Sequence, residues 1–190
     1  MTGDEVQALS ALWRTRWGGS PVANELPARH AERWVRFHSL PESKRYAETE
    51  AEYGVVLRRH RCVLAELGAR QGLYVIAGYF ADARAGASPD PRVHPGAVPW
   101  LTIEPGERSY FEIPLTLWVG RGSFDGPGLD ALLRRVADDD LGNAIIAPPD
   151  LKWLYHPYDG GADVIAPTVQ EQDALRRRHA DWLSAHPSGL

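Results

Sequence analysis

The run from Leu73 to Phe80 constrains the fold of this chain more than any other segment. It is apolar nearly throughout and rich in β-branched and aromatic residues. This composition is typical of a central strand that is buried on both of its faces. A strand of this kind lies inside a sheet, so we predict a β-sheet flanked by helices.

Four other segments have helical patterns. Thr2 and Glu5 have capping-box spacing near the start of the chain, and Thr168 and Glu171 repeat that spacing near its end. Apolar residues follow at helical intervals in each case. The predicted helices cover residues 2–17, residues 49–67, the stretch that follows Pro127 and the stretch that follows Thr168.

Shorter runs with strand character complete the predicted sheet. They are Trp34–His38, Tyr110–Val119, Ala144–Ala147, Lys152–His156 and Ala162–Ala166. Pro114 has no N–H to donate, so it should sit at an edge or a bulge. Asp159, Gly160 and Gly161 separate the last two runs and predict a hairpin whose glycines have positive φ.

The predicted architecture is a single domain over residues 1–190 of the α+β class. We expect an antiparallel or mixed sheet of about five to six strands, flanked by about four helices. Residues 82–99 are rich in Ala, Gly, Pro and Asp and break the pattern. They predict a loop or an insertion within that domain.

Composition and charge exclude several classes of protein. The net charge of -4 argues against a general nucleic-acid binder. No stretch approaches the roughly 20 apolar residues of a membrane span, and the first residues do not resemble a signal peptide, so we expect a cytoplasmic protein. Cys62 is the lone cysteine and cannot form an internal disulfide. Its helical surroundings favour a buried, inert thiol.

Basic and imidazole side chains gather in two neighbouring segments. Arg36 and His38 lie on a predicted strand, and Arg58 and His60 lie on the helix that follows. Arginine and histidine suit an anion or a phosphate, so the four residues are candidates for a small-molecule site.

The same residues also have a purely structural interpretation. Arg36 and Arg58 would pair with acids such as Glu42 or Glu52, and His60, on an apolar stripe, would be a hydrogen-bonded core histidine. The sequence favours this second interpretation.

Two further motifs are weaker. The stretch from Gly120 to Gly126 lies between a strand and a helix, where phosphate can bind, but the glycines lack dinucleotide spacing and Pro127 removes a donor. A simple turn is therefore predicted. His156, Asp159 and Asp163 offer metal-ligand atoms, but their spacing matches no closed site. We therefore expect no metal and no cofactor.

Two blocks carry a family resemblance. The first runs from Arg36 to Tyr46 and continues in the segment 57–60, and the second runs from Tyr155 to Ala166 and continues at 181–182. They resemble the bacterial family catalogued as domain of unknown function 3885. Asp159 and Asp163 match the family pattern and join the ligand-binding candidates. The resemblance implies no activity, substrate or cofactor.

The sequence favours a non-enzymatic protein-interaction module, of the immunity or antitoxin kind, whose partner is another protein. The motive is a small acidic domain with many tryptophans and no assembled catalytic set. The alternative is an enzyme or binding domain for an anionic small molecule that uses Arg36, His38, Arg58 and His60. Convergence of these four side chains in a pocket would favour the alternative.

Overall fold

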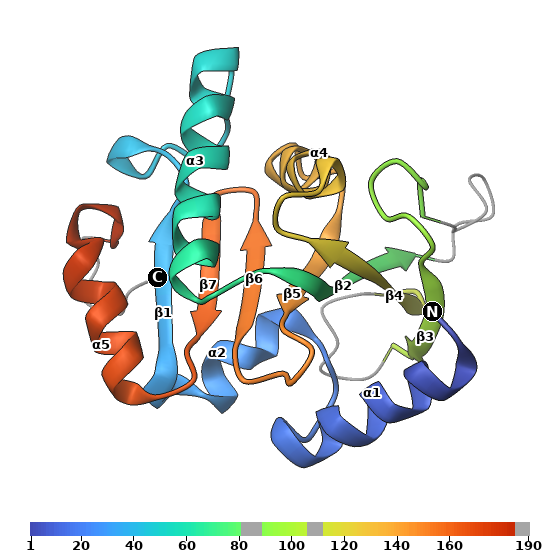
Figure 1. The fold of residues 1–190 in the computed structure, drawn as a ribbon. Coiled ribbons are helices and arrows are strands. Elements are labelled where there is room, and N and C mark those ends of the chain that lie inside the picture. The colour runs from blue at the N-terminus through green and yellow to red at the C-terminus, as the bar shows by residue number, and fades with distance from the viewer. Residues whose placement is uncertain (81–88, 106–111, 185–190) are drawn as a thin grey trace.

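The computed structural model describes residues 1–80, 89–105 and 112–184, which form one sheet with helices on both faces (Figure 1). The sheet has seven strands in the order β1-β7-β6-β5-β2-β4-β3, and every neighbouring pair is antiparallel. The strands are β1 (Trp34–His38), β2 (Gln71–Phe80), β3 (Val98–Ile103), β4 (Leu115–Ser123), β5 (Gly142–Ala147), β6 (Leu154–Tyr158) and β7 (Gly161–Ile165).

Five α-helices accompany the sheet in the described ranges: α1 (Gly3–Arg16), α2 (Leu26–Arg29), α3 (Glu50–Glu66), α4 (Pro127–Ala137) and α5 (Val169–Arg178). The predicted caps of α1 and α5 are confirmed. The Thr2 hydroxyl accepts from the Glu5 N–H at 3.3 Å, and the Thr168 hydroxyl accepts from the Glu171 N–H at 3.1 Å. Among the residues described, no helix has the length and apolar character needed to cross a membrane.

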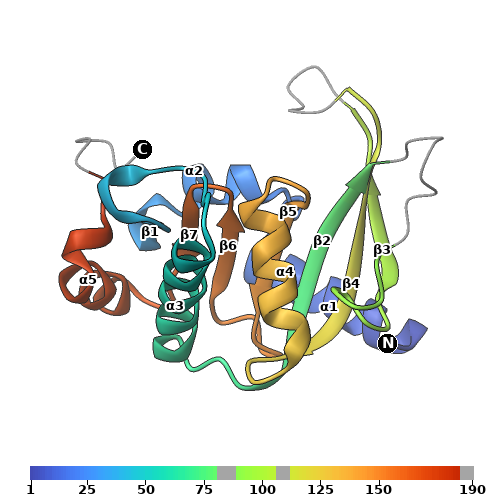
Figure 2. The same cartoon turned by 90° about the horizontal axis from the view of Figure 1, so that it is seen from above.

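The helices divide into two layers around the sheet. Figure 2 shows α3 and α4 side by side over one face of the sheet. Helices α3, α4 and α5 contribute buried residues to one core, and α1 and α2 contribute to the other. The central strand β2 supplies both cores, because Leu73, Val75 and Ala77 pack towards α3 and α4 while Tyr74 and Ile76 pack towards α1. The prediction of a central strand buried on both faces is confirmed. Each large apolar side chain buried in this way contributes about 1.5–3 kcal/mol.

The α+β class is confirmed, but the sheet is larger than predicted and contains no parallel pair. The sequence patterns missed the single turn of α2 and the strand β3. Strand β3 overlaps the end of the predicted loop or insertion at 82–99. Residues 89–97 of that segment form turns and bends, and 82–88 lie outside the described residues.

The strand predicted over Tyr110–Val119 is shifted along the chain. It begins at Leu115 and runs to Ser123, between β2 and β3, and residues 110–111 lie outside the described part. Pro114 therefore precedes the strand and removes no ladder hydrogen bond from it, contrary to the expected edge or bulge position. A different proline lies at an irregularity, since the pairing register of β3 shifts between Pro99 and Leu101.

The two outer strands are both protected from pairing with another chain. Strand β1 lies beside α5, and the Gln172 side-chain amide donates to the Trp34 carbonyl at 2.9 Å. Strand β3 carries Pro99 and the register shift. Proline and bulges both interrupt the row of free backbone groups at a sheet edge.

The hairpin between β6 and β7 lies at the predicted position. Its glycines, however, are required for a different physical reason than the predicted positive φ. Tyr158 pairs with Gly161, so Asp159 and Gly160 form the two-residue turn. Neither Gly160 nor Gly161 takes a positive φ, which corrects the prediction. Gly161 belongs to strand β7, where a Cβ would lie 2.1 Å from the carbonyl oxygen of Phe37. The glycine is needed because β1 approaches it closely.

We predict that Gly161→Ala lowers the free energy of unfolding by roughly 3 kcal/mol, because the added methyl forces β1 and β7 apart. Gly160→Ala is the matched control, since its Cβ would meet the Arg45 side chain at 3.4 Å and could be accommodated. Urea unfolding of the two variants and the wild type measures the difference. Equal stability of the two variants would contradict this explanation.

Candidate functional site

The Arg/His cluster predicted from the sequence does not assemble into one pocket. Val35 and Phe37 of β1 face the core under α3, so strand alternation turns Arg36 and His38 to the other face. His60 is buried between α3 and the sheet, and Arg58 is exposed on α3. The four side chains therefore lie on two sides of the sheet and cannot hold one ligand together.

Arg36 is paired with Asp163, not with Glu42 or Glu52 as expected. Its Nε donates to Asp163 Oδ1 at 2.8 Å and its Nη2 donates to Oδ2 at 2.9 Å. The Trp34 indole N–H also donates to Oδ1, at 2.8 Å. The carboxylate is buried, so these three charge-assisted bonds satisfy it.

Aromatic rings complete the surroundings of Arg36. The guanidinium carbon lies 5.4 Å from the ring centroid of Trp34 and 5.1 Å from that of Tyr158. Hydrogen bonding to Asp163 raises the pKa of Arg36 above its ordinary value. A guanidinium held in this way binds its own carboxylate and is not available to an external anion.

His38 and Arg58 make separate interactions. Burial, with Arg36 and Arg59 nearby, lowers the pKa of His38, so its neutral form is favoured. Arg58 donates to the carbonyl of Gly54 in its own helix at 3.4 Å. His38 and Arg58 therefore do not face a common ligand position.

His60 has the geometry expected of a hydrogen-bonded core histidine. Its Nδ1 lies 2.6 Å from the Tyr155 hydroxyl and its Nε2 lies 3.1 Å from the Ser39 hydroxyl. Burial lowers the pKa of His60 from 6.5 to about 4. The neighbouring cavity holds about 10 Å³, too little for a substrate. The Ser39–His60 contact therefore serves the packing of α3 on the sheet.

The three residues weighed as metal ligands each have a different partner. The Asp159 carboxylate accepts from Arg45 Nε at 2.5 Å and from the Gly160 N–H at 3.0 Å. His156 Nδ1 lies 2.8 Å from the Ala144 carbonyl oxygen, and Asp163 binds Arg36. These contacts give Asp159 a role in the turn and Asp163 a role in joining β1 to β7.

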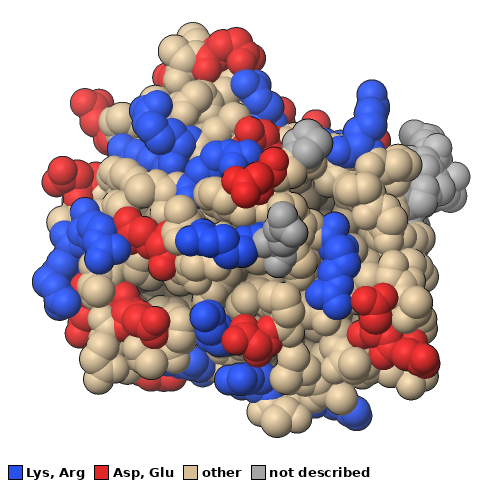
Figure 3. Space-filling view, viewed as in Figure 1, with Lys and Arg blue, Asp and Glu red and all other residues tan. Residues whose placement is uncertain are grey.

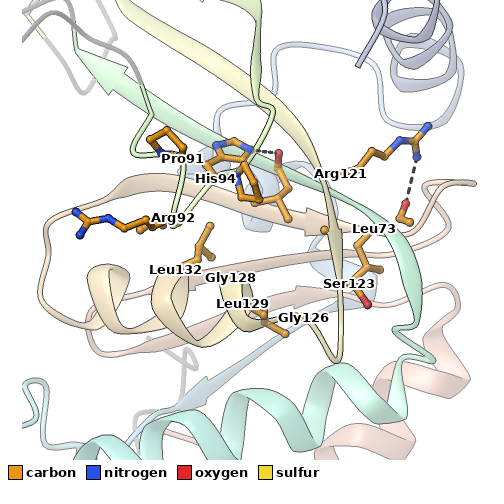
Figure 4. Close-up of a pocket in the computed structure, with 15 residues that line it drawn as sticks. Leu73, Pro91, Arg92, His94, Arg121, Ser123, Gly126, Gly128, Leu129 and Leu132 are labelled. Carbon is orange, nitrogen blue, oxygen red and sulfur yellow. Dashed lines mark hydrogen bonds between the residues drawn. The ribbon is translucent and has the colours of Figure 1, made fainter.

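A cavity of about 650 Å³ lies elsewhere, over the end of the sheet where β2 and β4 meet α4 (Figure 4). Its walls come from the start of β2, the end of β4, the turn at 91–95 and the first turns of α4. The lining residues are Gly72, Leu73, Val75, Pro91, Arg92, Val93, His94, Pro95, Arg121, Gly122, Ser123, Gly126, Gly128, Leu129 and Leu132. A volume of this size is typical of small-molecule sites.

Two glycines of β4 allow the side chains that line the cavity to pack directly on the strand. Strand alternation places Gly120 and Gly122 on the α4 side of the sheet, between Val119 and Ser123. A Cβ at Gly122 would lie 2.7 Å from Val75 Cγ2, and one at Gly120 would lie 2.9 Å from His94 Cδ2. The glycines therefore make room for Val75 and His94, which are both lining residues of the cavity.

His94 forms one wall and has a defined tautomer. Its Nε2 lies 2.9 Å from the Val75 carbonyl oxygen, as Figure 4 shows. A carbonyl only accepts, so Nε2 carries the proton. Burial lowers the pKa of His94, which favours the neutral ring, and Nδ1 is a buried acceptor without a partner among the described atoms.

The charged groups of the lining lie at its rim. Figure 4 shows Arg121 directed away from the cavity; its guanidinium donates to the Gly72 carbonyl and lies over the Tyr74 ring. Arg92 is exposed and paired with Asp90. Helix α4 begins at the cavity with Gly126 as its N-cap, which supplies no side-chain hydrogen bond.

The stretch from Gly120 to Gly126 corrects a prediction from the sequence. The sequence predicts a simple turn, but the first four residues of the stretch belong to β4. Glycine at alternate positions of a strand allows other side chains to approach the backbone closely, as Val75 and His94 do here. His94 lies beyond the patterned segments, and nothing in its local sequence indicated a role.

The fold and the cavity define an α+β protein with a single antiparallel sheet and a ligand-sized cavity at one end of it. The chain belongs to the family described as Domain of unknown function (DUF3885), whose family model matches residues 22–187. The resemblance of the two sequence blocks is thereby confirmed. No curated protein and no solved structure matches the chain.

We predict that Asp163→Asn lowers the free energy of unfolding by about 2–4 kcal/mol, because it leaves the guanidinium of Arg36 partly buried without its carboxylate. Asp159→Asn is the control and should have a smaller effect, since its partner Arg45 is largely exposed. Chemical denaturation measures both. A larger loss for Asp159→Asn would contradict the assignment.

His60 predicts a pH dependence of stability. The unfolded chain binds a proton at an ordinary pKa of 6.5 and the folded chain at about 4, so the unfolded state gains protons first as the pH falls. The contribution of neutral His60 to the free energy of unfolding is fully present above pH 6.5. This contribution decreases by about 3 kcal/mol in total as the pH falls towards 4.

The His60→Ala variant isolates this contribution. It should be less stable than the wild type at neutral pH, with a stability difference that narrows as the pH is lowered through this window. Denaturation curves at a series of pH values measure it. A constant difference between the two proteins would show that His60 is not held neutral.

Proposed function

We propose that this protein is a binding domain for a small molecule with a flat apolar body and an anionic group. The observation that carries the proposal is the cavity of about 650 Å³ between β2, β4, the turn at 91–95 and α4. Largely apolar cavities of this size with a few polar groups at the rim are the usual form of a ligand site.

The walls account for the apolar body. Leu73, Val75 and Val93 are buried side chains of the lining, and Leu129 and Leu132 face them from α4. Gly122 lies beneath Val75, whose Cγ2 would be 2.7 Å from a Cβ at that position. A planar ring system placed in the cavity would bury apolar area against the leucines and valines.

The start of α4 accounts for the anionic group. The partial positive charge of a helix N-terminus favours an anion, and the N-cap Gly126 adds no acidic or hydroxyl side chain that would already satisfy it. Pro127 has no N–H, which leaves the Gly128 N–H as the first donor of the helix. None of the described lining residues carries a carboxylate, and Arg92 lies at the rim.

An anionic small molecule is also the ligand of the alternative function expected from the sequence. The residues of the proposed site, however, are different from the Arg/His cluster. Arg36 is bound to Asp163 and His60 is buried, so neither supports a ligand site. We propose binding rather than catalysis, because His94 is the buried titratable residue of this lining and none of the described lining residues carries a carboxylate that could act together with its Nδ1.

Anilinonaphthalene sulfonate, a flat apolar anion, is a suitable probe of the cavity. We predict binding of one probe per chain, and Gly128→Leu should weaken it at least roughly tenfold by filling the space. Gly128→Ala is the matched control, because its Cβ would meet the Val93 carbonyl oxygen at an ordinary 3.6 Å. Alanine and leucine both have a higher helix propensity than glycine, and circular dichroism checks that both variants are folded.

Fluorescence titration gives the affinities, and amide chemical shifts locate the probe. Neutral N-phenylnaphthylamine should bind more weakly than the sulfonate; equal affinity would remove the anionic part of the proposal. Unchanged binding in Gly128→Leu, or shifts confined to residues away from the cavity, would contradict the proposed site.

The protein-interaction role, of the immunity or antitoxin kind, is our second proposal. Its support is an acidic surface formed by the exposed residues 138–140 after α4 and by Glu50 of α3. Arg134 joins the two helices by donating to Glu50 at 2.7 Å, and the Tyr53 hydroxyl donates to Asp138. This surface suits a basic patch on a partner protein.

The face of the molecule that carries α3 and α5 does not have one dominant charge. Figure 3 shows basic and acidic side chains interspersed on the face that carries α3 and α5. Nucleic-acid binders usually concentrate Lys and Arg on one face, so the mixed pattern supports our proposal that nucleic acid is not a partner.

A further inference from the structure

Three side chains that can bind a metal ion meet where α3 and α5 end. Cys62 Sγ, a Glu66 carboxylate oxygen and a His179 ring nitrogen all lie within 4.8 Å of one another. We propose that they form a binding site for a divalent transition metal of the zinc class. This site is independent of the cavity at α4 and of the function proposed for it.

The helices place the three ligands without strain on the chain. Cys62 and Glu66 are four residues apart, so they lie on the same side of the last two turns of α3. His179 is the C-cap residue of α5. The C-terminus of α3 carries a partial negative charge and has no basic residue in its own last turn, so a cation is favoured there.

The Glu66 carboxylate is oriented as a ligand would be. Its Oε1 atom lies 2.9 Å from His179 Nε2 and 3.8 Å from Cys62 Sγ, while Oε2 accepts from Arg178. Zn²⁺ at about 2.0–2.3 Å from each donor would place the three donor atoms roughly 3–4 Å apart, close to these separations. Arg178 would then bind the second carboxylate oxygen, Oε2, and orient Glu66 as outer-shell partners of metal ligands do.

The imidazole ring is fixed before any ion binds. His179 stacks on the indole of Trp182, with centroids 4.1 Å apart and planes at 20°, and the Phe37 ring meets it edge-on at 5.6 Å. The ring is buried, with 6% of the residue exposed. This packing directs Nε2 at Glu66 and reduces the entropy that a ligand loses on binding.

Cys62 supplies a soft ligand that solvent can reach. The residue is partly exposed, which corrects the expectation of a buried thiol. A thiolate, an imidazole and a carboxylate together suit Zn²⁺, Co²⁺ and related ions and leave a fourth position open. The expectation of no metal rests on the single cysteine and on histidines without ligand spacing along the chain. Neither observation reports that His179 lies beside Cys62.

Cobalt binding tests the site, because a Co²⁺–thiolate bond gives a charge-transfer absorption in the near ultraviolet. Tag-free, reduced full-length protein is titrated with Co²⁺ and then with Zn²⁺ in competition. We expect one ion per chain, the charge-transfer band, and displacement of Co²⁺ by Zn²⁺. Cys62→Ser should remove the band and weaken Zn²⁺ binding by roughly a hundredfold.

Two further variants distinguish loss of a metal ligand from a general change in folding or surface charge. His179→Gln should also weaken Zn²⁺ binding, although it removes ring packing and its folding is checked by circular dichroism. Glu32→Gln replaces an exposed carboxylate elsewhere and should leave binding unchanged. Absence of the charge-transfer band in the wild type, or full Zn²⁺ affinity in the folded Cys62→Ser variant, would overturn the proposal.

Discussion

The burial of β2 on both faces is the constraint on which the rest of this structure depends. An apolar strand with no solvent-facing side must have a hydrogen-bonded neighbour along each edge and a helix layer against each face. Strands β4 and β5 supply the two neighbours, and α1 and the α3–α4 pair supply the layers. The cavity lies where this cover is incomplete, between the start of β2, the end of β4 and the first turns of α4.

At the other end of the sheet, polar side chains are used for structure. The guanidinium of Arg36 is paired with the carboxylate of Asp163, and His60 is hydrogen-bonded to Tyr155 and Ser39. Each group would be costly to bury alone, so its partner determines where β1 and α3 lie relative to β6 and β7. Polar residues that stand out in the sequence can therefore hold strands and helices together, and need not bind a ligand.

Both proposed sites arise from features that are inconspicuous along the chain. The α4 cavity is bounded by Val75 and His94, which pack closely over Gly122 and Gly120 of β4. The cluster of Cys62, Glu66 and His179 depends on two helix ends that meet. Neither has the regular residue spacing by which ligand motifs are found, so neither was predicted.

Local patterns in the sequence determined the central strand, the hairpin position and the capped helices, because each depends on neighbours within a few residues. The threonine caps and the apolar run at 73–80 needed no distant partner to be interpreted correctly. Tertiary structure alone decided that Arg36 pairs with Asp163 rather than Glu42, and that Cys62 lies beside His179. These contacts join residues more than a hundred positions apart, and which of several equivalent charges meet is decided by sheet register and helix packing.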